Sequence, residues 1–400
     1  MRKRDCSKRE GIKNMQPNKR RIPAVLFFLL IWMVSLSSGS ALAAETDETL
    51  YRIKNNGVYG FIDKQGAIVI PPRYTGVRQL SEGLIAVQTA TANKWGYIDR
   101  NGKFVIPPRF RQSFDFSEGL AVVSVEPHGN VGYIDKSGKL VIPPVFQSGE
   151  PFRNGKACVR TTTGTMFIDT TGAIILETPY PDAWELSNGY IAFFDGSELG
   201  FLDKQGKLII APSFHRVTYG RQDLFNEKIT PVSNGPKNQN SWGFIDTTGK
   251  TVVKFEYDWA EQFQEGMAIV CKNKLYGFVE TTGKQAIPLR FEEVWKFSEG
   301  LAAVKTGGLW GFIDKTGRWA IPPQYQSLIF GSPIEFHYGL AVVRTANGTG
   351  VINRAGEIVV APIYRTISDF DSNGIAEVML PYGERGYIDR TGRYIWTPSW

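Results

Sequence analysis

Short apolar runs alternate with turn-forming residues along the chain, in an order that is repeated many times. In one example, the apolar runs Leu120–Val125, Val131–Ile134 and Leu140–Ile142 follow one another. The first and third runs are apolar at successive positions, which is typical of strands covered on both faces of a sheet. Asp-x-x-Gly stands between the second and third runs and is a hairpin signal. The pattern therefore predicts a three-stranded antiparallel meander.

This unit recurs throughout the chain. The stretch WGFIDKTGRWAIPP from Trp310 returns as WGYIDRNGKFVIPP from Trp95 and as VGYIDKSGKLVIPP from Val131. Self-similarity at a period of about 20 to 50 residues is the signature of a repeat architecture. Ten copies extend from about Thr49 to Trp400, and the glycines that close their turns are Gly66, Gly102, Gly138, Gly172, Gly206, Gly249, Gly283, Gly317, Gly356 and Gly392.

We expect an all-β tandem array of about ten such meanders, arranged as a curved open array. The alternatives are a propeller-like ring or two five-unit halves, because propellers usually have about four to eight blades of four strands. The widest spacing falls between the fifth and sixth units and places an insertion at about residues 219–241. Functional residues lie in loops more often than in the scaffold, which favours a role for this insertion. Long surface insertions also cost little stability, so an insertion without a function stays open as well.

Two positions keep their residue type in nearly every copy. An aromatic residue stands eight places after each anchor glycine, as at Phe110, and we interpret it as a core plug whose burial stabilises by about 2–3 kcal/mol. A glycine occupies the second strand in nine copies, and Met166 replaces it in the remaining one. Glycine inside a strand indicates close approach of another group, which we expect to be a neighbouring aromatic ring.

The recurring W-G-[FY]-I-D-x-x-G-x-x-x-I-P-P resembles the WG repeat family of bacterial proteins, also called KWG repeats. The resemblance covers essentially all of the chain after its first residues. It implies an all-β tandem repeat and a binding role. It implies no catalytic residues and no general ligand.

The first residues have the pattern of a secretory signal peptide. Residues 1–21 are rich in Lys and Arg, Ala24–Val34 is uninterrupted and apolar, and small residues follow up to Ala44. The apolar run is too short for a spanning helix, which needs about 20 residues. We expect cleavage after Ala43, a mature chain of residues 44–400 and a secreted or periplasmic protein. Membrane anchoring by an uncleaved signal is the alternative, and translation from Met15 would give a more ordinary signal.

Removal of the signal changes the charge balance. The chain has 46 basic and 39 acidic residues, of which nine basic and two acidic residues lie in residues 1–43, so 46 − 9 = 37 and 39 − 2 = 37 remain. A neutral mature chain lacks the basic face of a nucleic-acid-binding protein. We therefore expect no nucleic-acid partner, and a membrane contact only through the signal. Cys158 and Cys271 lie in distant repeats, so we expect them to be unbonded.

No pattern for catalysis, metal binding or a cofactor stands out. The repeated turn acid is Asp in eight copies, Glu280 in one and Asn353 in another, and Asn cannot act as a general base, so a turn role is favoured. The histidines, His128, His215 and His337, occur singly. The stretch from Asp369 to Gly374 begins like a calcium loop but has Leu380 where the bidentate acid belongs. We expect no enzyme, no metal and no cofactor.

The candidate binding residues are Trp95, Trp242 and Trp310, which share one place in the second strand. If the indole rings face outward, they would form a row of surfaces on which a glycan or a partner could stack. If they face inward, they would cap the glycine of an adjacent strand and have a structural role. Thr349 and Arg385 at the same place in other copies favour a surface position. We expect an exported binding or interaction scaffold with a protein or cell-envelope glycan partner. A structural envelope protein and an enzyme acting on cell-wall glycans are the alternatives, and no feature indicates an oligomeric state.

Overall fold

A computed structural model describes residues 49–126, 129–215, 224–235 and 241–399. Residues 47–400 form one compact unit. The described residues form β-strands and two short 3₁₀ turns, η1 (Asn226–Lys228) and η2 (Ile329–Gly331), which confirms the all-β prediction. In these ranges no helix has the length and apolar character that crossing a membrane requires. The expected signal peptide lies outside the described residues.

The strands form ten antiparallel sheets, one per repeat, which we call blades and number in chain order. The first five blades are β1 (Tyr51–Asn55), β2 (Val58–Ile62), β3 (Ile68–Tyr74); β4 (Gly76–Ser81), β5 (Leu84–Gln88), β6 (Trp95–Asp99), β7 (Phe104–Phe110); β8 (Gln112–Ser113), β9 (Leu120–Ser124), β10 (Val131–Asp135), β11 (Leu140–Phe146); β12 (Ser148–Gly149), β13 (Lys156–Arg160), β14 (Thr165–Asp169), β15 (Ile174–Thr178); and β16 (Asp182–Glu185), β17 (Ile191–Asp195), β18 (Glu198–Leu202), β19 (Leu208–Phe214).

The other five blades are β20 (Ile229–Ser233), β21 (Trp242–Asp246), β22 (Thr251–Tyr257); β23 (Trp259–Ala260), β24 (Met267–Lys272), β25 (Leu275–Glu280), β26 (Gln285–Phe291); β27 (Glu293–Val294), β28 (Leu301–Thr306), β29 (Leu309–Asp314), β30 (Trp319–Tyr325); β31 (Phe336–His337), β32 (Leu340–Thr345), β33 (Gly348–Asn353), β34 (Ile358–Tyr364); and β35 (Thr366–Ile367), β36 (Ile375–Met379), β37 (Arg385–Asp389), β38 (Tyr394–Ser399).

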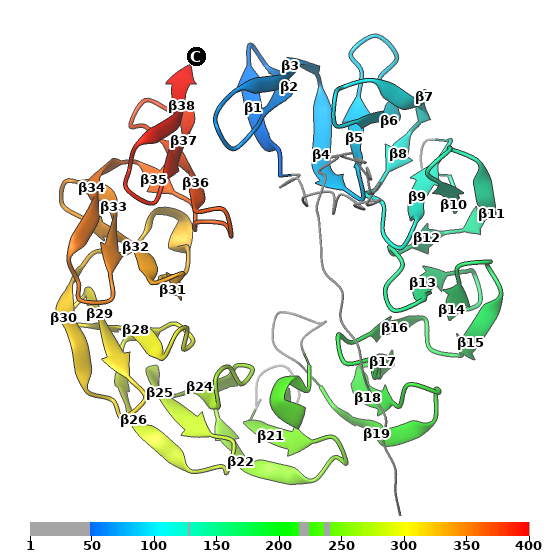
Figure 1. The fold of residues 1–400 in the computed structure, drawn as a ribbon. Helices are drawn as coiled ribbons and strands as arrows, with labels where there is room; N and C mark the ends of the chain where they lie inside the picture. Colours follow the sequence, from blue (N-terminus) through cyan, green and yellow to red (C-terminus); the bar gives the residue numbers. More distant parts are fainter. Residues whose placement is uncertain (1–48, 127–128, 216–223, 236–240, 400) are drawn as a thin grey trace, which may run out of the picture. The chain divides into compact units, whose positions relative to one another are not determined.

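The blades close into a ring, so the chain is a ten-bladed propeller rather than the curved open array that we expected. Each hydrophobic cluster joins two neighbouring blades, and one of them joins Tyr51 and Ile53 of the first blade to Ile375 of the last. Figure 1 shows the first and last blades side by side. The physical reason is burial: each sheet is apolar on both faces, and an open array would leave one face of each terminal blade in water. The propeller-like alternative is confirmed, and the alternative of two five-unit halves is wrong.

Most blades have four strands, not the three that we expected. In most of these blades the additional strand has two residues and follows the aromatic plug of the preceding repeat, as β8 follows Phe110. Strands β4 and β16 are longer, and β31 begins further along the chain, after η2. Its pairing is fixed by the backbone: the Arg111 N–H donates to the Ser124 carbonyl at 2.7 Å. Two residues are too short for a periodic pattern, so this strand was not visible in the sequence.

The strand-two glycine is explained by a bulge and not, in most copies, by a neighbouring ring. Trp95 faces Phe110 while Tyr97 faces Ile106, so the Pro-Pro stretch of β7 bulges over Gly96. A Cβ on Gly96 would lie 2.6 Å from the Ile106 carbonyl oxygen and 2.7 Å from the Pro108 nitrogen. An aromatic ring does lie across two of the glycines, Gly200 and Gly243.

The plug and the turn acid have the roles that the sequence predicts. Phe110 is 3% exposed, and most of its counterparts in the described residues are also buried. The Asp99 carboxylate accepts the N–H groups of Asn101 and Lys103, both at 2.9 Å. Asn353 accepts two such bonds with its side-chain oxygen at 3.0 Å, which confirms that the position needs a turn acceptor.

The predicted insertion contains ordinary parts of the sixth blade. Within it, β20 is the first strand of that blade, and Phe225 packs on Phe201 of the fifth blade with ring centres 4.9 Å apart. Glu227 accepts the Gly266 N–H of the seventh blade. Strand β20, Phe225 and Glu227 are therefore not what makes this repeat longer than the others. Residues 216–223 and 236–240 of this region lie outside the described residues.

Both cysteines are free and buried, in agreement with the sequence prediction. Burial raises the pKa of the Cys158 thiol to about 12 and also raises that of Cys271. Since the thiolate is the reactive form, we expect neither thiol of the folded protein to react promptly with a disulfide reagent at pH 8. Two thiols should react at once after unfolding without reductant. Prompt reaction of one in the folded protein would contradict this burial.

Candidate functional site at the junction of the first and last blades

The tryptophans of the second strand do not form an exposed ladder. Trp242 and Trp310 are 1% and 2% exposed, and Trp95 is partly buried against the core. Thr349, which we took as a sign of a surface position, is 1% exposed, and its hydroxyl donates to the Arg365 carbonyl at 3.0 Å. A hydroxyl can thus replace the indole in a buried place when it finds an acceptor. The burial of Trp242 and Trp310 therefore fits the alternative in which these rings face inward and are structural.

Neighbouring blades are joined by the F-S-E-G stretch, a turn that precedes the first long strand of a repeat, as at Phe116–Gly119. Its phenylalanine packs on the strand-two aromatic of the preceding blade, as Phe116 does on Tyr97 with ring centres 4.9 Å apart. The same pair recurs at Tyr133–Phe152, Phe244–Phe263, Phe278–Phe297 and Phe312–Phe336. The phenylalanine recurs at one place in the copies, and that was a usable signal.

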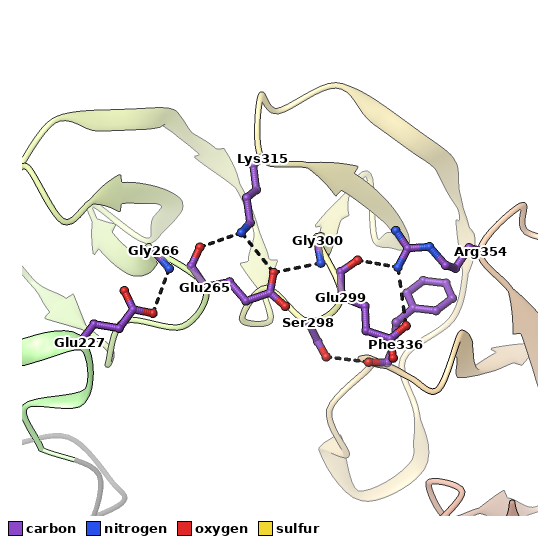
Figure 2. Close-up of polar contacts among 9 residues, drawn as sticks. All are labelled: Glu227, Glu265, Gly266, Ser298, Glu299, Gly300, Lys315, Phe336 and Arg354. Carbon is purple, nitrogen blue, oxygen red and sulfur yellow. Dashed lines mark hydrogen bonds and ion pairs between the residues drawn. The ribbon is translucent and has the colours of Figure 1, made fainter. Parts of the chain in front are cut away.

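The glutamate of this stretch makes the polar part of the joint. Glu265 accepts the Gly300 N–H of the next blade at 2.9 Å and lies 3.2 Å from the Lys315 ammonium. Glu299 repeats the arrangement one blade later, where it accepts the Gly339 N–H at 3.0 Å. Figure 2 shows Glu265 with Gly300 and Lys315, and Glu299 with Arg354. These carboxylates are used to hold blades together, so we do not assign them to a ligand site.

The junction of the first and last blades, which we call the seam, uses other contacts. Tyr51 packs on Tyr387 with ring centres 5.4 Å apart and donates to the Asp371 carboxylate at 2.6 Å. The Tyr387 hydroxyl donates to the Arg52 carbonyl at 2.7 Å. Asn373 donates to the Thr49 hydroxyl at 3.1 Å. The stretch that resembles the start of a calcium loop is therefore a closing contact, and no cluster suited to a metal occurs among the described residues.

Two adjoining pockets lie at the seam, of about 590 and 550 Å³. Both are lined by Arg52, Glu377 and Tyr387. The walls of the larger pocket come from the first blade on one side and the last blade on the other, and they include Lys54, Tyr59, Tyr382, Glu384, Arg385 and Trp396. Pockets of this size, lined by aromatic residues and a few polar groups, are typical of binding sites.

Charge is distributed unevenly over the larger pocket. On the first blade, the guanidinium of Arg52 and the ammonium of Lys54 lie 5.4 and 5.1 Å from the centre of the Tyr59 ring. On the last blade, Glu377 is neutralised by Arg385 at 2.7 Å. One Glu384 carboxylate oxygen is buried and has no hydrogen-bond partner among the described residues, which is costly unless a donor is supplied.

An exposed aromatic residue completes the site. Tyr382 is 86% exposed and stands on the turn between β36 and β37. None of the residues that line the larger pocket was predicted as a binding residue from the sequence. Several depart from the repeat: Trp396, for example, replaces the Ile, Leu or Val of strand three. The seam can hold a ligand by stacking, ion pairing and hydrogen bonding.

Comparison with known proteins supports the repeat assignment. The family model described as "WG containing repeat" matches residues 59–90, 95–126, 132–161, 242–276, 276–310, 310–348 and 350–380, which together are more than half of the chain. No curated protein matches the chain.

Solved structures show distant likeness. A structure described as the eukaryotic initiation factor is 12% identical, with 78% of this chain and 95% of that chain covered and a TM-score of 0.48. BamB from Moraxella catarrhalis is 11% identical, with 84% and 92% covered and a TM-score of 0.32. The extracellular domain of a putative one component system from B. thetaiotaomicron is 12% identical, with 88% and 64% covered and a TM-score of 0.28.

Proposed function

Because the chain belongs to the family of WG-containing repeat proteins, we propose that it is a non-enzymatic scaffold that binds a partner at the seam. The observation that carries this proposal is the pair of adjoining pockets between the first and last blades. The exposed ring of Tyr382 and the buried, unpartnered oxygen of Glu384 support it, since both gain from a bound group.

The proposal includes export. Residues 1–43 have the pattern of a secretory signal peptide, and this pattern is the basis for proposing export. Partners in that compartment are envelope proteins and cell-envelope glycans. Both offer polar groups for Arg52, Lys54 and Glu384.

The test is retention of the chain 44–400 by purified peptidoglycan and by envelope proteins. We expect the double variant Tyr382→Ala/Glu384→Gln to be retained about tenfold less, because it loses a stacking surface and an acceptor. Tyr338→Ala is the matched control, since Tyr338 is an exposed tyrosine of the ninth blade.

Equal retention of the double variant and the control would count against binding at the seam. Hydrolysis of the glycan by the purified chain would count against a non-enzymatic role. Sequencing the N-terminus of the exported protein should show Ala44.

A further inference from the structure

Exposed apolar side chains gather on the last strand of each blade. Among the described residues, thirteen of the eighteen large exposed apolar side chains lie on these strands, so their distribution is not random. Figure 1 shows β7 and β11, the last strands of the second and third blades, at the outer rim of the ring. These two neighbouring strands carry five of the thirteen, which we call the rim patch: Phe104, Val105, Leu140, Val141 and Val145. Exposed apolar patches mark interaction surfaces.

The fold does not require apolar residues at these places. Phe104 packs edge-on against Tyr74, the plug of the preceding blade, with ring centres 6.3 Å apart, so one use of this place is to cover a plug. The seventh blade has Gln285 at the same place, and the Tyr257 plug before it is still 7% exposed. The last strands of the sixth and seventh blades, both described in full, carry no large exposed apolar side chain. Packing alone therefore does not explain the rim patch.

Positive charge accompanies the rim patch. From the turn acid to the residue after the plug, the second and third repeats span residues 99–111 and 135–147, which contain six basic and two acidic residues. The same spans of the sixth and seventh repeats, 246–258 and 280–292, contain four basic and five acidic residues. Apolar and basic character are therefore combined on one part of the rim, and both are lower on another part with the same backbone.

A partner of this rim has to be bound by side chains rather than by strand pairing. Strands β7 and β11 contain Pro-Pro at residues 107–108 and 143–144, and proline has no N–H to donate to another strand. Prolines on an edge strand are a common protection against such pairing. Lys103 and Lys139 are exposed, and each comes directly before an apolar residue of the rim patch. The surface thus offers ammonium groups beside apolar side chains.

We propose that the rim patch, together with Lys103 and Lys139, binds the surface of a lipid bilayer with anionic headgroups. Apolar side chains enter the boundary between headgroups and acyl chains, and the ammonium groups are attracted by the anionic headgroups. A fluid surface suits side chains on an outer rim, because it needs no matching groove, and the two large pockets lie elsewhere, at the seam. This contact would be a second one with the membrane, beside that of the signal sequence, and it does not depend on binding at the seam.

The test is sedimentation of the chain 44–400 with vesicles of phosphatidylcholine, with and without phosphatidylglycerol. We expect binding to the anionic vesicles that weakens as salt is added. Lys103→Gln/Lys139→Gln should weaken it about 25-fold, since each lysine near an anionic surface contributes roughly fivefold. The matched control is Lys250→Gln/Lys284→Gln, which removes the lysines at the same place in the sixth and seventh repeats. This control should bind like the unmodified chain.

A dye on the rim tests the apolar part of the contact without removing a packed side chain. Val105 is the bulged residue of β7, because Tyr97 faces Ile106 and Ile98 faces Phe104. Both native cysteines are buried, so an environment-sensitive thiol dye attaches to a new cysteine in Val105→Cys. We expect its emission to shift to the blue on anionic vesicles. Ala286→Cys, at the same place in the seventh repeat, should show no shift.

Equal binding to neutral and anionic vesicles, equal loss in the two lysine pairs, or no shift at Val105→Cys would overturn the proposal. If the chain sediments with no vesicles but is retained by immobilised polyglutamate through Lys103 and Lys139, the rim serves an acidic protein, and lipid binding is overturned. Retention by peptidoglycan at the seam is measured separately, so the proposed function is confirmed or contradicted independently of this result.

Discussion

Gly132→Met is expected to destabilise the propeller by about 3–5 kcal/mol, among the largest effects of any single change in the chain. A Cβ on Gly132 would lie 2.8 Å from the Pro143 carbonyl carbon and the Pro144 nitrogen. Both atoms belong to the backbone of the bulge, which cannot move aside as a flexible side chain would. The measurement is denaturant unfolding of the variant beside the unmodified chain.

The fourth blade provides the matched control. There Met166 stands at the glycine position and faces Glu177 in regular register, because strand β15 has no Pro-Pro bulge at this place. Met166→Gly should therefore cost about 1–2 kcal/mol, from the lost side chain and the greater freedom of glycine in the unfolded chain. Similar losses in the two variants would show that the bulge does not select the glycine.

Phe110→Ala is expected to cost about 3–5 kcal/mol, since it removes a buried plug and leaves a cavity. Phe110 belongs to the hydrophobic cluster that joins the second and third blades. Its removal should therefore weaken the contact between two blades as well as its own sheet. Unfolding by denaturant should show a lower midpoint with an unchanged slope.

Asp99→Asn should cost less than about 1 kcal/mol in the same measurement. The side-chain oxygen of Asn353 already accepts the two turn N–H groups in the ninth blade, as Asp99 does in the second. If Asp99→Asn proved worse than Phe110→Ala, the carboxylate would have a role beyond the turn. A catalytic or binding role for the repeated acid would then need a separate test.

The repeat made much of each blade predictable. Ten copies of one pattern defined the three long strands, the Asp-x-x-Gly hairpin and the plug, because these depend on residues close together in the sequence. The short strand was missed because two residues such as Gln112 and Ser113 carry no periodicity. Ring closure was predicted only as an alternative, because it depends on the angle between neighbouring blades, which many small packing contacts determine and no single motif encodes.

The candidate site was not predicted from the repeat. Thr349 stands at the place that Trp310 has in its own copy, and a threonine there favoured a surface position. Both side chains are buried. The acceptor for the Thr349 hydroxyl is the Arg365 carbonyl, which is distant in the sequence and was not visible in the repeat. The seam residues escaped notice for the opposite reason. Positions such as Tyr51 and Trp396 depart from the pattern, and a search for what the copies share passes over them.

The closing contacts also determine the order in which the ring can assemble. The Gly339–Glu299 bond between neighbouring blades joins residues 40 positions apart, whereas Tyr51 and Asp371 are 320 positions apart. Each doubling of a loop adds about 0.6 kcal/mol of closure entropy, so this eightfold difference adds roughly 2 kcal/mol at the seam. Nine junctions can form as the chain grows from one blade to the next. The tenth has to wait for both ends, which makes the seam the last junction to form and the first to open.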